Sequence, residues 1–255
     1  MILSHSKKFI FFRVAKTGST TAEVMLRLSN AFDFEQDTLT GTREWELPTI
    51  NRLEQRYDTE LFDWTHATPQ DLIDLKVMTL DQLREYDCYA FVRPIGSRFV
   101  SGYMHCVGSK RKWTRVEQMG LQPHQFMERW RQDHERFSAW EIIGRKQVDW
   151  FYCEGEQIVT PLDFNNYENE LQALLKKLDG NQFLEIPKLN RSIQEPSFIE
   201  TRREWARQIW ETQPEIQQEV LEHYIEDYRF YENNFGTSNT QLYKSERTES
   251  VAEVG

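Results

Sequence analysis

The sequence lacks the features that mark several classes of protein. It has three cysteines in 255 residues, an odd number, so neither a disulfide framework nor a cysteine zinc site is expected and a reducing compartment is the simpler interpretation. No apolar run approaches the roughly 20 residues of a membrane-spanning helix. No signal-peptide apolar segment follows Lys7 and Lys8. These absences predict a soluble, cytoplasmic protein without stable membrane insertion.

Positive charge is also scarce. The chain has 31 lysines and arginines against 41 acidic residues, which gives a formal net charge of −10. This balance argues against nucleic acid as a partner but leaves room for a small basic pocket around an anionic ligand. Hydrophobic residues at 39% are typical of a folded protein. We expect a single domain over residues 1–235 and a disordered, polar tail over residues 236–255.

Short buried strands alternate with helical patterns along the chain, and this order predicts an α/β fold. We expect a P-loop-like three-layer sandwich, in which helices flank a central parallel sheet on both faces. Ligands of such sheets bind beyond the carboxyl ends of the strands, where the turns after Val14 and Val92 lie. The predicted strands are 8–14, 88–93 and 157–164, and the predicted helices are 20–32, 97–107, 165–180, 198–212 and 214–231.

The turn after the first strand reads Ala-Lys-Thr-Gly-Ser-Thr-Thr over residues 15–21. A strand that hands over to a helix leaves backbone N–H groups unpaired, and these groups and the helix dipole favour an anion. Gly18 allows close approach of the backbone, Lys16 adds a charge, and the hydroxyls that follow add donors. A serine or threonine here is also a common helix N-cap, so the turn alone does not decide between the two roles.

This turn does not match the phosphate loop of nucleotide kinases. That loop needs a glycine, four residues, and then Gly-Lys-Ser/Thr. Here Lys16 precedes Gly18 and position 11 is phenylalanine. The pattern therefore favours an anion site of another kind.

The turn after the second strand reads Phe-Val-Arg-Pro-Ile-Gly-Ser-Arg-Phe-Val-Ser. Arg93 ends the strand, and Arg98 and Ser101 follow at the start of the next helix. An arginine and a serine so placed are able to converge on one phosphate, which the planar guanidinium binds with two N–H groups. Taken alone, this segment favours the interpretation of the two arginines as surface ion-pair residues.

Together, the two turns resemble those of the sulfotransferases that use 3′-phosphoadenosine 5′-phosphosulfate (PAPS). The resemblance spans about residues 8–235 and is closest to the carbohydrate-type branch, among soluble members of bacterial or viral type. It includes the segment Tyr-x-x-Asp-x-x-x-Tyr over residues 224–231. In two places the pattern departs from the family, with Ala15 where proline is usual and with Pro94 one position early.

The resemblance implies PAPS as co-substrate, a loop that grips its 5′-phosphosulfate, a clamp for its 3′-phosphate and no metal. Lys16 would also stabilise charge on the leaving phosphate during catalysis. The residues implied for donor binding are Lys16, Thr17, Gly18, Ser19, Thr20, Thr21, Arg93, Arg98 and Ser101.

A general base is needed to remove the proton of the acceptor hydroxyl. His66 is the leading candidate because "FDWTHATPQDLI" predicts a short strand, a turn and a helix with Thr68 as N-cap and Pro69 at its first position. Carbohydrate-type sulfotransferases resemble this, with a histidine in a His-x-Thr/Ser turn between the two cofactor loops. The alternative role is a structural histidine that hydrogen-bonds its own turn. Glu23 and His105 are weaker candidates.

The sequence therefore predicts a sulfotransferase that acts on a hydroxyl of a small molecule or oligosaccharide, with a carbohydrate as the expected acceptor class. Two alternatives stay open: a nucleotide or small-molecule kinase of related fold, and a non-catalytic nucleotide-binding protein. The oligomeric state and the acceptor itself are not indicated. Residues 33–61 and 108–136 are expected to shape the acceptor site.

Overall fold

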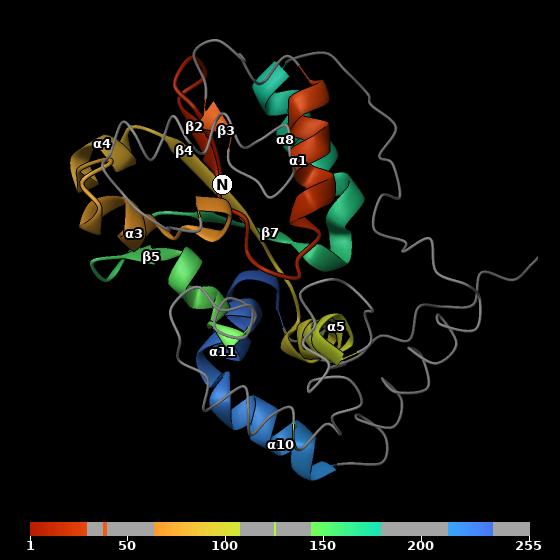
Figure 1. Cartoon of the computed structure of the whole chain (residues 1–255). Coiled ribbons are helices and arrows are strands. Elements are labelled where there is room, and N and C mark those ends of the chain that lie inside the picture. The colour runs from red at the N-terminus through yellow and green to blue at the C-terminus, as the bar shows by residue number, and fades with distance from the viewer. Residues whose placement is uncertain (30–37, 40–63, 108–124, 126–143, 180–213, 237–255) are drawn as a thin grey trace, which may run out of the picture.

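A computed structural model describes residues 1–29, 38–39, 64–107, 125, 144–179 and 214–236 of the chain. Its centre is a five-stranded sheet with the strand order β3-β1-β2-β4-β7, and a separate two-stranded hairpin is formed by β5 and β6 (Figure 1). The strands are β1 Ile2–Ser4, β2 Phe9–Phe11, β3 Thr38–Leu39, β4 Asp87–Val92, β5 Tyr152–Cys153, β6 Glu156–Gln157 and β7 Thr160–Asp163.

Helices cover both faces of this sheet. In Figure 1, α1 and α8 lie along one side of the strands, α3 and α4 lie on the other side, and α5, α10 and α11 gather below the sheet. The α-helices are α1 Ser19–Leu28, α3 Pro69–Asp74, α4 Leu80–Arg84, α5 Ile95–Val107, α8 Tyr167–Asp179, α10 Pro214–His223 and α11 Ile225–Phe235. Short 3₁₀ helices are η2 Trp64–His66, η4 Gln147–Trp150 and η5 Phe164–Asn166.

The predicted parallel sheet is confirmed for its three central strands. β4 pairs in parallel with β2 on one side and with β7 on the other, so the carboxyl ends of all three strands meet at one edge. The sheet is nevertheless mixed, because β1 pairs antiparallel with both β2 and β3. These two strands were not predicted; with only two or three residues each, they carry too little periodicity to be recognised from sequence.

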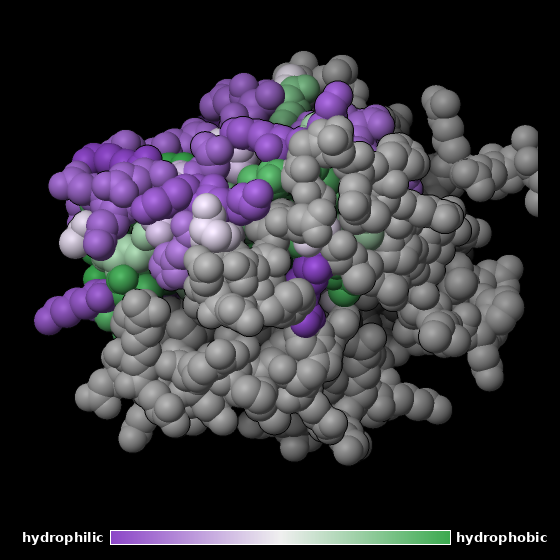
Figure 2. Space-filling view, turned by 90° about the horizontal axis from the view of Figure 1, so that it is seen from above, coloured by the Kyte–Doolittle hydropathy of each residue, from purple (hydrophilic) through white to green (hydrophobic). Residues whose placement is uncertain are grey.

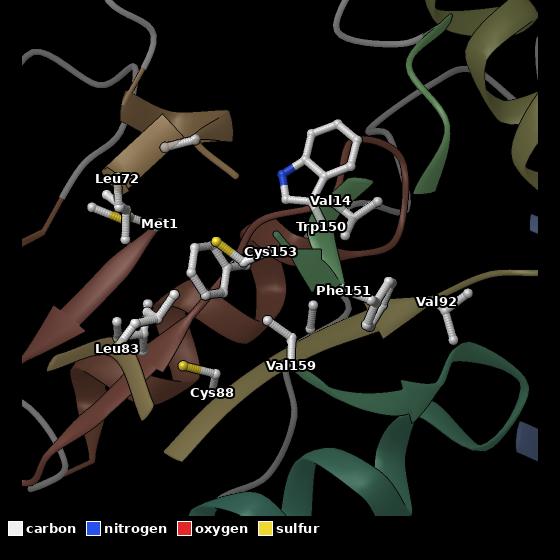
Figure 3. Packing of buried hydrophobic residues seen from close by; sticks show 14 of the residues in the cluster. Met1, Val14, Leu72, Leu83, Cys88, Val92, Trp150, Phe151, Cys153 and Val159 are labelled. Carbon is white, nitrogen blue, oxygen red and sulfur yellow. The ribbon is translucent and has the colours of Figure 1, made fainter. Parts of the chain in front are cut away.

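Side chains of the central strands point alternately to the two faces of the sheet, where they form two separate hydrophobic cores. On β4, Tyr89 and Phe91 face α1 and α8, where they pack with Leu171 and Leu174. Cys88, Ala90 and Val92 point to the opposite face, as the period of two in a β-strand requires. This second core also contains Leu72, Trp150 and Phe151, and Figure 3 shows the packing of its residues in a close view. Strands buried on both faces are typical of a parallel sheet between helical layers.

Two sequence-based predictions in the described residues need correction. Residues 64–66 form the 3₁₀ helix η2, where the end of a short strand and a turn were expected. The helix predicted over 214–231 is two helices, because Tyr224 leaves helical geometry with φ −109° and ψ 30°. The helix predicted at 198–212 and the tail after residue 236 lie outside the described residues.

On the face that Figure 2 shows, the described residues are mostly hydrophilic. Figure 2 shows the molecule from above, with polar residues over most of the coloured surface and smaller apolar areas between them. Within the described part of the chain, no helix has both the length and the apolar character to cross a membrane.

Candidate active site

The turn between β2 and α1 has a backbone shaped for an anion. The φ angles of Lys16 and Gly18 are +68° and +75°, whereas Thr17 between them has negative φ. A turn in which φ alternates in sign is able to direct successive N–H groups toward one concavity, and such an arrangement suits an anion. The hydroxyl of Thr17 donates to the carbonyl of Val14 at 2.9 Å and closes the turn. Helix α1 begins directly after Gly18, which has no side chain to cap the helix end.

Gly18 is required at this position for two reasons. Its φ of +75° is one that residues with a Cβ rarely adopt. A Cβ built there would lie 2.8 Å from Cε2 of Tyr167 and 3.2 Å from Cε2 of Phe164. Tyr167 also donates its hydroxyl hydrogen to the Gly18 carbonyl at 2.8 Å, and burial raises the pKa of this phenol, so it stays protonated as a donor. The start of α8 therefore supports the loop.

The second turn lies against the first. From the carboxyl end of β4, the Arg93 guanidinium donates through Nη1 to the carbonyl of Lys16 at 3.0 Å and through Nε to Oγ of Ser97 at 2.8 Å. It also stacks over the ring of Phe164, with Cζ 4.3 Å from the ring centroid. The structure thus brings together the lysine and the arginine that the sequence assigned to opposite ends of one donor.

The Arg93 backbone is fixed as firmly as its side chain. Gln147 accepts a hydrogen bond from the Arg93 N–H at 3.0 Å and donates one to the Arg93 carbonyl at 2.9 Å. Sequence analysis did not find this role of Gln147, since a single glutamine 54 residues from its partner carries no local signal. Ser101, two helical turns further along α5, is buried.

Arg98 has a different environment from the one that the sequence suggested. Its side chain is 1% exposed, and it donates to the carbonyls of Ala15 at 3.2 Å and Arg145 at 2.9 Å. Its Nη1 lies 3.9 Å from Oδ2 of Asp227. The side chain is thus enclosed by protein groups in this structure, and the donor contact predicted for Arg98 stays a prediction. Through the Ala15 carbonyl, Arg98 holds from behind the turn over residues 15–21, the candidate phosphate loop.

His66 lies beside the first turn and makes the contact expected of an oriented base. Its Nδ1 is 2.7 Å from the carbonyl oxygen of Arg13, and its own carbonyl accepts a hydrogen bond from Nε1 of Trp150 at 3.1 Å. A carbonyl only accepts, so Nδ1 carries the proton and Nε2 of the neutral ring holds the lone pair. The predicted helix start is confirmed, with Thr68 as N-cap in a capping box and Pro69 in the first turn.

Glu23 and His105 were the weaker candidates for the general base. Glu23 is 1% exposed and forms an ion pair of 2.7 Å with Arg13, whose carbonyl orients His66. A carboxylate buried against an arginine is a poor proton acceptor, because the pairing favours its charged form. Glu23 thus helps to fix Arg13, and the carbonyl of Arg13 in turn orients His66. The side chain of His105 lies outside the described part of the chain.

Comparison with known proteins identifies the family. The sequence model of the Sulfotransferase family matches residues 1–234. This chain belongs to that family. Neither a curated protein nor a solved structure matched the sequence. The turn over residues 15–21, the Arg93 turn and His66 all lie inside the matched range.

Positively charged and hydroxyl-bearing residues of this sulfotransferase lie at one edge of the sheet. Lys16 and the first turn of α1, with Ser19, Thr20 and Thr21, lie at the same sheet edge as Arg93. In the described residues no group of three or more histidine, cysteine, aspartate or glutamate side chains is arranged to hold a metal ion. The stretches expected to shape the acceptor site lie almost entirely outside the described residues.

A cavity of about 960 Å³ opens elsewhere on the sulfotransferase, among α3, η4, the β5–β6 hairpin and α11. None of the sequence-predicted donor residues lines it, nor does His66. Its walls carry charges of both signs, including Arg145, Asp149 and Glu226. We therefore place the donor site by the geometry of the two turns and not by the size of this cavity.

Substitution of Gly18 tests the shape of the loop. Gly18→Ala should destabilise the protein by about 1–3 kcal/mol, because it combines an unfavourable φ with crowding against Tyr167. Gly155→Ala is the matched control: its φ is +82°, but nothing lies within 4 Å of the added Cβ. Urea denaturation should therefore show the larger loss for Gly18→Ala. Equal losses would contradict the close approach of α8 to the loop.

Proposed function

We propose that this sulfotransferase uses PAPS as its donor and transfers the sulfuryl group to a carbohydrate hydroxyl. The observation that carries the proposal is the hydrogen bond from the Arg93 guanidinium to the Lys16 carbonyl. It joins a phosphate loop to a second cationic turn at one sheet edge. Such a pair of sites suits a nucleotide with phosphates at both its 5′ and 3′ positions.

The loop over residues 15–21 would hold the 5′ end of the donor. Its concave backbone and the first turn of α1 offer N–H groups, and the Lys16 ammonium adds a positive charge. When bound, the donor supplies a sulfuryl group on a phosphate leaving group. Lys16 would stabilise the negative charge that develops on that phosphate, a role worth on the order of 10²-fold or more in rate.

Arg93 and Ser101 would hold the 3′-phosphate. A guanidinium already fixed through Ser97 and Lys16 loses little freedom on binding, which favours tight recognition. The 3′-phosphate is the group that distinguishes PAPS from ATP. This assignment therefore favours a sulfotransferase donor over the ATP of a kinase.

His66 would accept the proton of the acceptor hydroxyl. Because Nδ1 donates to the Arg13 carbonyl, Nε2 is the atom with the free lone pair, and it stays so only while the ring is neutral. A hydroxyl placed within hydrogen-bond distance of Nε2 would lose its proton to it as the oxygen bonds to sulfur. The carbohydrate class of the acceptor rests on the likeness of the His66 turn to that of carbohydrate-type sulfotransferases.

Arg93→Ala tests the donor assignment by a ratio of affinities. In the wild type, adenosine 3′,5′-bisphosphate should bind more tightly than 5′-AMP, since a charge-assisted hydrogen bond contributes about 1.5–3 kcal/mol, or roughly ten- to a hundredfold. The variant should lose most of that preference. The ratio is the readout because Arg93 also holds the Lys16 carbonyl, so the affinity for 5′-AMP itself should fall as well.

The affinities for both ligands are measured by calorimetry, and two further variants serve as controls. Ser101→Ala should reduce the preference without affecting 5′-AMP. Arg84→Ala removes an exposed arginine paired with Asp81 and Glu156 and should leave both affinities unchanged. A wild type that binds the two ligands equally would refute PAPS as the donor, and preferential binding of ATP with Mg²⁺ would point to a kinase.

The pH dependence of turnover tests His66. A histidine that acts as a general base must be neutral. The rate should therefore rise as the pH increases through the range in which imidazoles lose their proton, whose unperturbed pKa is about 6.5. His66→Ala should lose roughly 10²- to 10⁴-fold in rate and still bind the bisphosphate. Loss of bisphosphate binding in this variant would instead indicate a structural histidine.

A control is needed because a second group titrates in this range. Loss of solvation, followed by the charge of Asp227, raises the pKa of Asp149 to about 6. Ionisation of this carboxyl would also give a rate that rises with pH. Asp149→Asn should therefore keep the rise if His66 causes it, and a flat profile in Asp149→Asn would exclude His66 as its source.

A further inference from the structure

One face of α11 is polar and yet buried. Asp227 and Tyr231 are four residues apart, so they lie on the same side of the helix, and Tyr224 is its N-cap residue; each of the three is less than 9% exposed. Their neighbours Ile225 and Glu226 are exposed. Buried polar side chains need partners within the protein, and each of these three has one in a segment distant in sequence.

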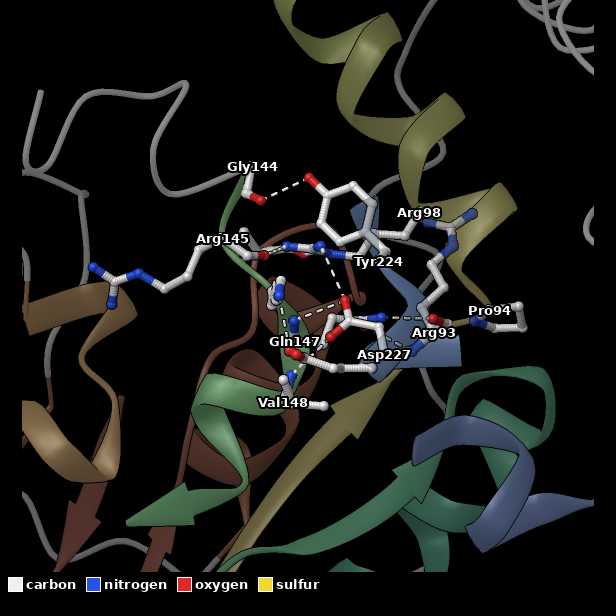
Figure 4. Close-up of polar contacts among 12 residues, drawn as sticks. Arg93, Pro94, Arg98, Gly144, Arg145, Gln147, Val148, Tyr224 and Asp227 are labelled. Atoms are coloured by element: carbon white, nitrogen blue, oxygen red, sulfur yellow. Dashed lines mark hydrogen bonds and ion pairs between the residues drawn. The ribbon is translucent and has the colours of Figure 1, made fainter. Parts of the chain in front are cut away.

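Asp227 has the most partners of the three. Its carboxylate accepts hydrogen bonds from the backbone N–H groups of Gln147 at 2.8 Å and Val148 at 3.0 Å. Oδ2 also lies 3.9 Å from Nη1 of Arg98, and both side chains of this ion pair are fully buried. Figure 4 shows the Asp227 carboxylate between these partners.

Two of the partners of Asp227, Arg98 and Gln147, each contact one of the two candidate donor turns directly. Arg98 donates to the carbonyl of Ala15, the first residue of the phosphate loop. Gln147 brackets the backbone N–H and carbonyl of Arg93 with its side-chain amide. The path from α11 to either turn is therefore two contacts long.

We propose that Asp227 is a positioning residue that sets the phosphate loop and the Arg93 turn relative to each other. It acts through Arg98 on the first turn and through Gln147 on the second, and it touches neither the donor nor the acceptor. The reading of these turns as a donor site rests on the proposed function, whereas the structural link between them does not.

The charge of Asp227, and not only its shape, is needed for this link. Burial lowers the pKa of Arg98 and raises the pKa of Asp227, and the opposite charge of each partner counteracts the shift of the other. An asparagine would still accept a backbone hydrogen bond but would leave the buried Arg98 cation without its anion. A buried charge that loses its partner destabilises its surroundings. The carbonyls that Arg98 holds should then move.

Asp227→Asn tests the proposal, with Glu226→Gln as the matched control because the carboxylate of Glu226 is exposed and pairs with Lys146. Amide hydrogen exchange is measured on the ligand-free proteins. In Asp227→Asn the exchange of residues 13–20 and 92–98 should become faster by about tenfold or more, equivalent to about 1.4 kcal/mol. The exchange of α8 should change less, and Glu226→Gln should match the wild type. Unchanged exchange in both turns of Asp227→Asn would overturn the proposal.

A double variant separates positioning from stability. Arg98→Met with Asp227→Leu removes both buried charges, and such replacements are often neutral or stabilising. This variant should fold and still show faster exchange in both turns, since neither Ala15 nor Gln147 is then held. A folded double variant with wild-type exchange in the turns would refute the proposal. If both Asp227 variants fail to fold, Gln147→Met, which leaves no unpaired charge, should loosen residues 92–98 alone; unchanged exchange there would refute it equally.

Ligand binding adds a readout that loss of stability does not produce. Partial unfolding lowers the affinities for adenosine 3′,5′-bisphosphate and 5′-AMP by the same factor, whereas displacement of Arg93 lowers their ratio, by about tenfold here. A wild type without any preference would refute the proposed donor, and the exchange data would still decide whether Asp227 positions the turns.

Discussion

The hydrogen bond from the Arg93 guanidinium to the Lys16 carbonyl is the contact that turns two sequence motifs into one site. Neither turn is specific by itself. The first has the alternating backbone of an anion-binding loop, and the second has an arginine at the end of a buried strand. Because β2 and β4 are parallel neighbours, their carboxyl ends lie at the same edge, and one arginine is able to bridge them. The sheet topology therefore sets the distance between the two candidate anion sites.

This arrangement requires charged groups that the fold must bury. Arg13 with Glu23 and Arg98 with Asp227 are both enclosed, and each pair stands behind a candidate functional group. The first lies behind the carbonyl that orients His66, and the second behind the phosphate loop. Buried ion pairs seldom add much net stability, so their value here is the fixed position of the groups in front of them.

Local sequence was sufficient for much of the fold. The three central strands, and the helix N-cap at Thr68, were predicted because apolar runs and capping residues act over a few positions. β1 was missed because three residues show no period. The break at Tyr224 was missed because its cause is tertiary: the side chain is fully buried and its hydroxyl donates to the Gly144 carbonyl.

Some residues of the candidate site were also predicted from local sequence, whereas others were found only in the structure. Lys16, Gly18 and Arg93 were predicted from motifs and follow the parallel strands β2 and β4 at one edge of the sheet, and His66 contacts the Arg13 carbonyl; their functional roles stay predictions. Arg98 belongs to the same motif, but only the three-dimensional structure reveals that it faces the interior. Gln147 and Asp227 act across about 80 residues of sequence, and no local pattern indicates which carbonyl or N–H group they will meet.

A crystal structure with adenosine 3′,5′-bisphosphate is the most direct test of the claim that the two turns form one donor site. We expect the 5′-phosphate against the backbone of Gly18 and Ser19, and the 3′-phosphate against the guanidinium of Arg93 and the hydroxyl of Ser101. A bisphosphate bound in the cavity between η4 and α11, or one that contacts only one of the two turns, would contradict the account.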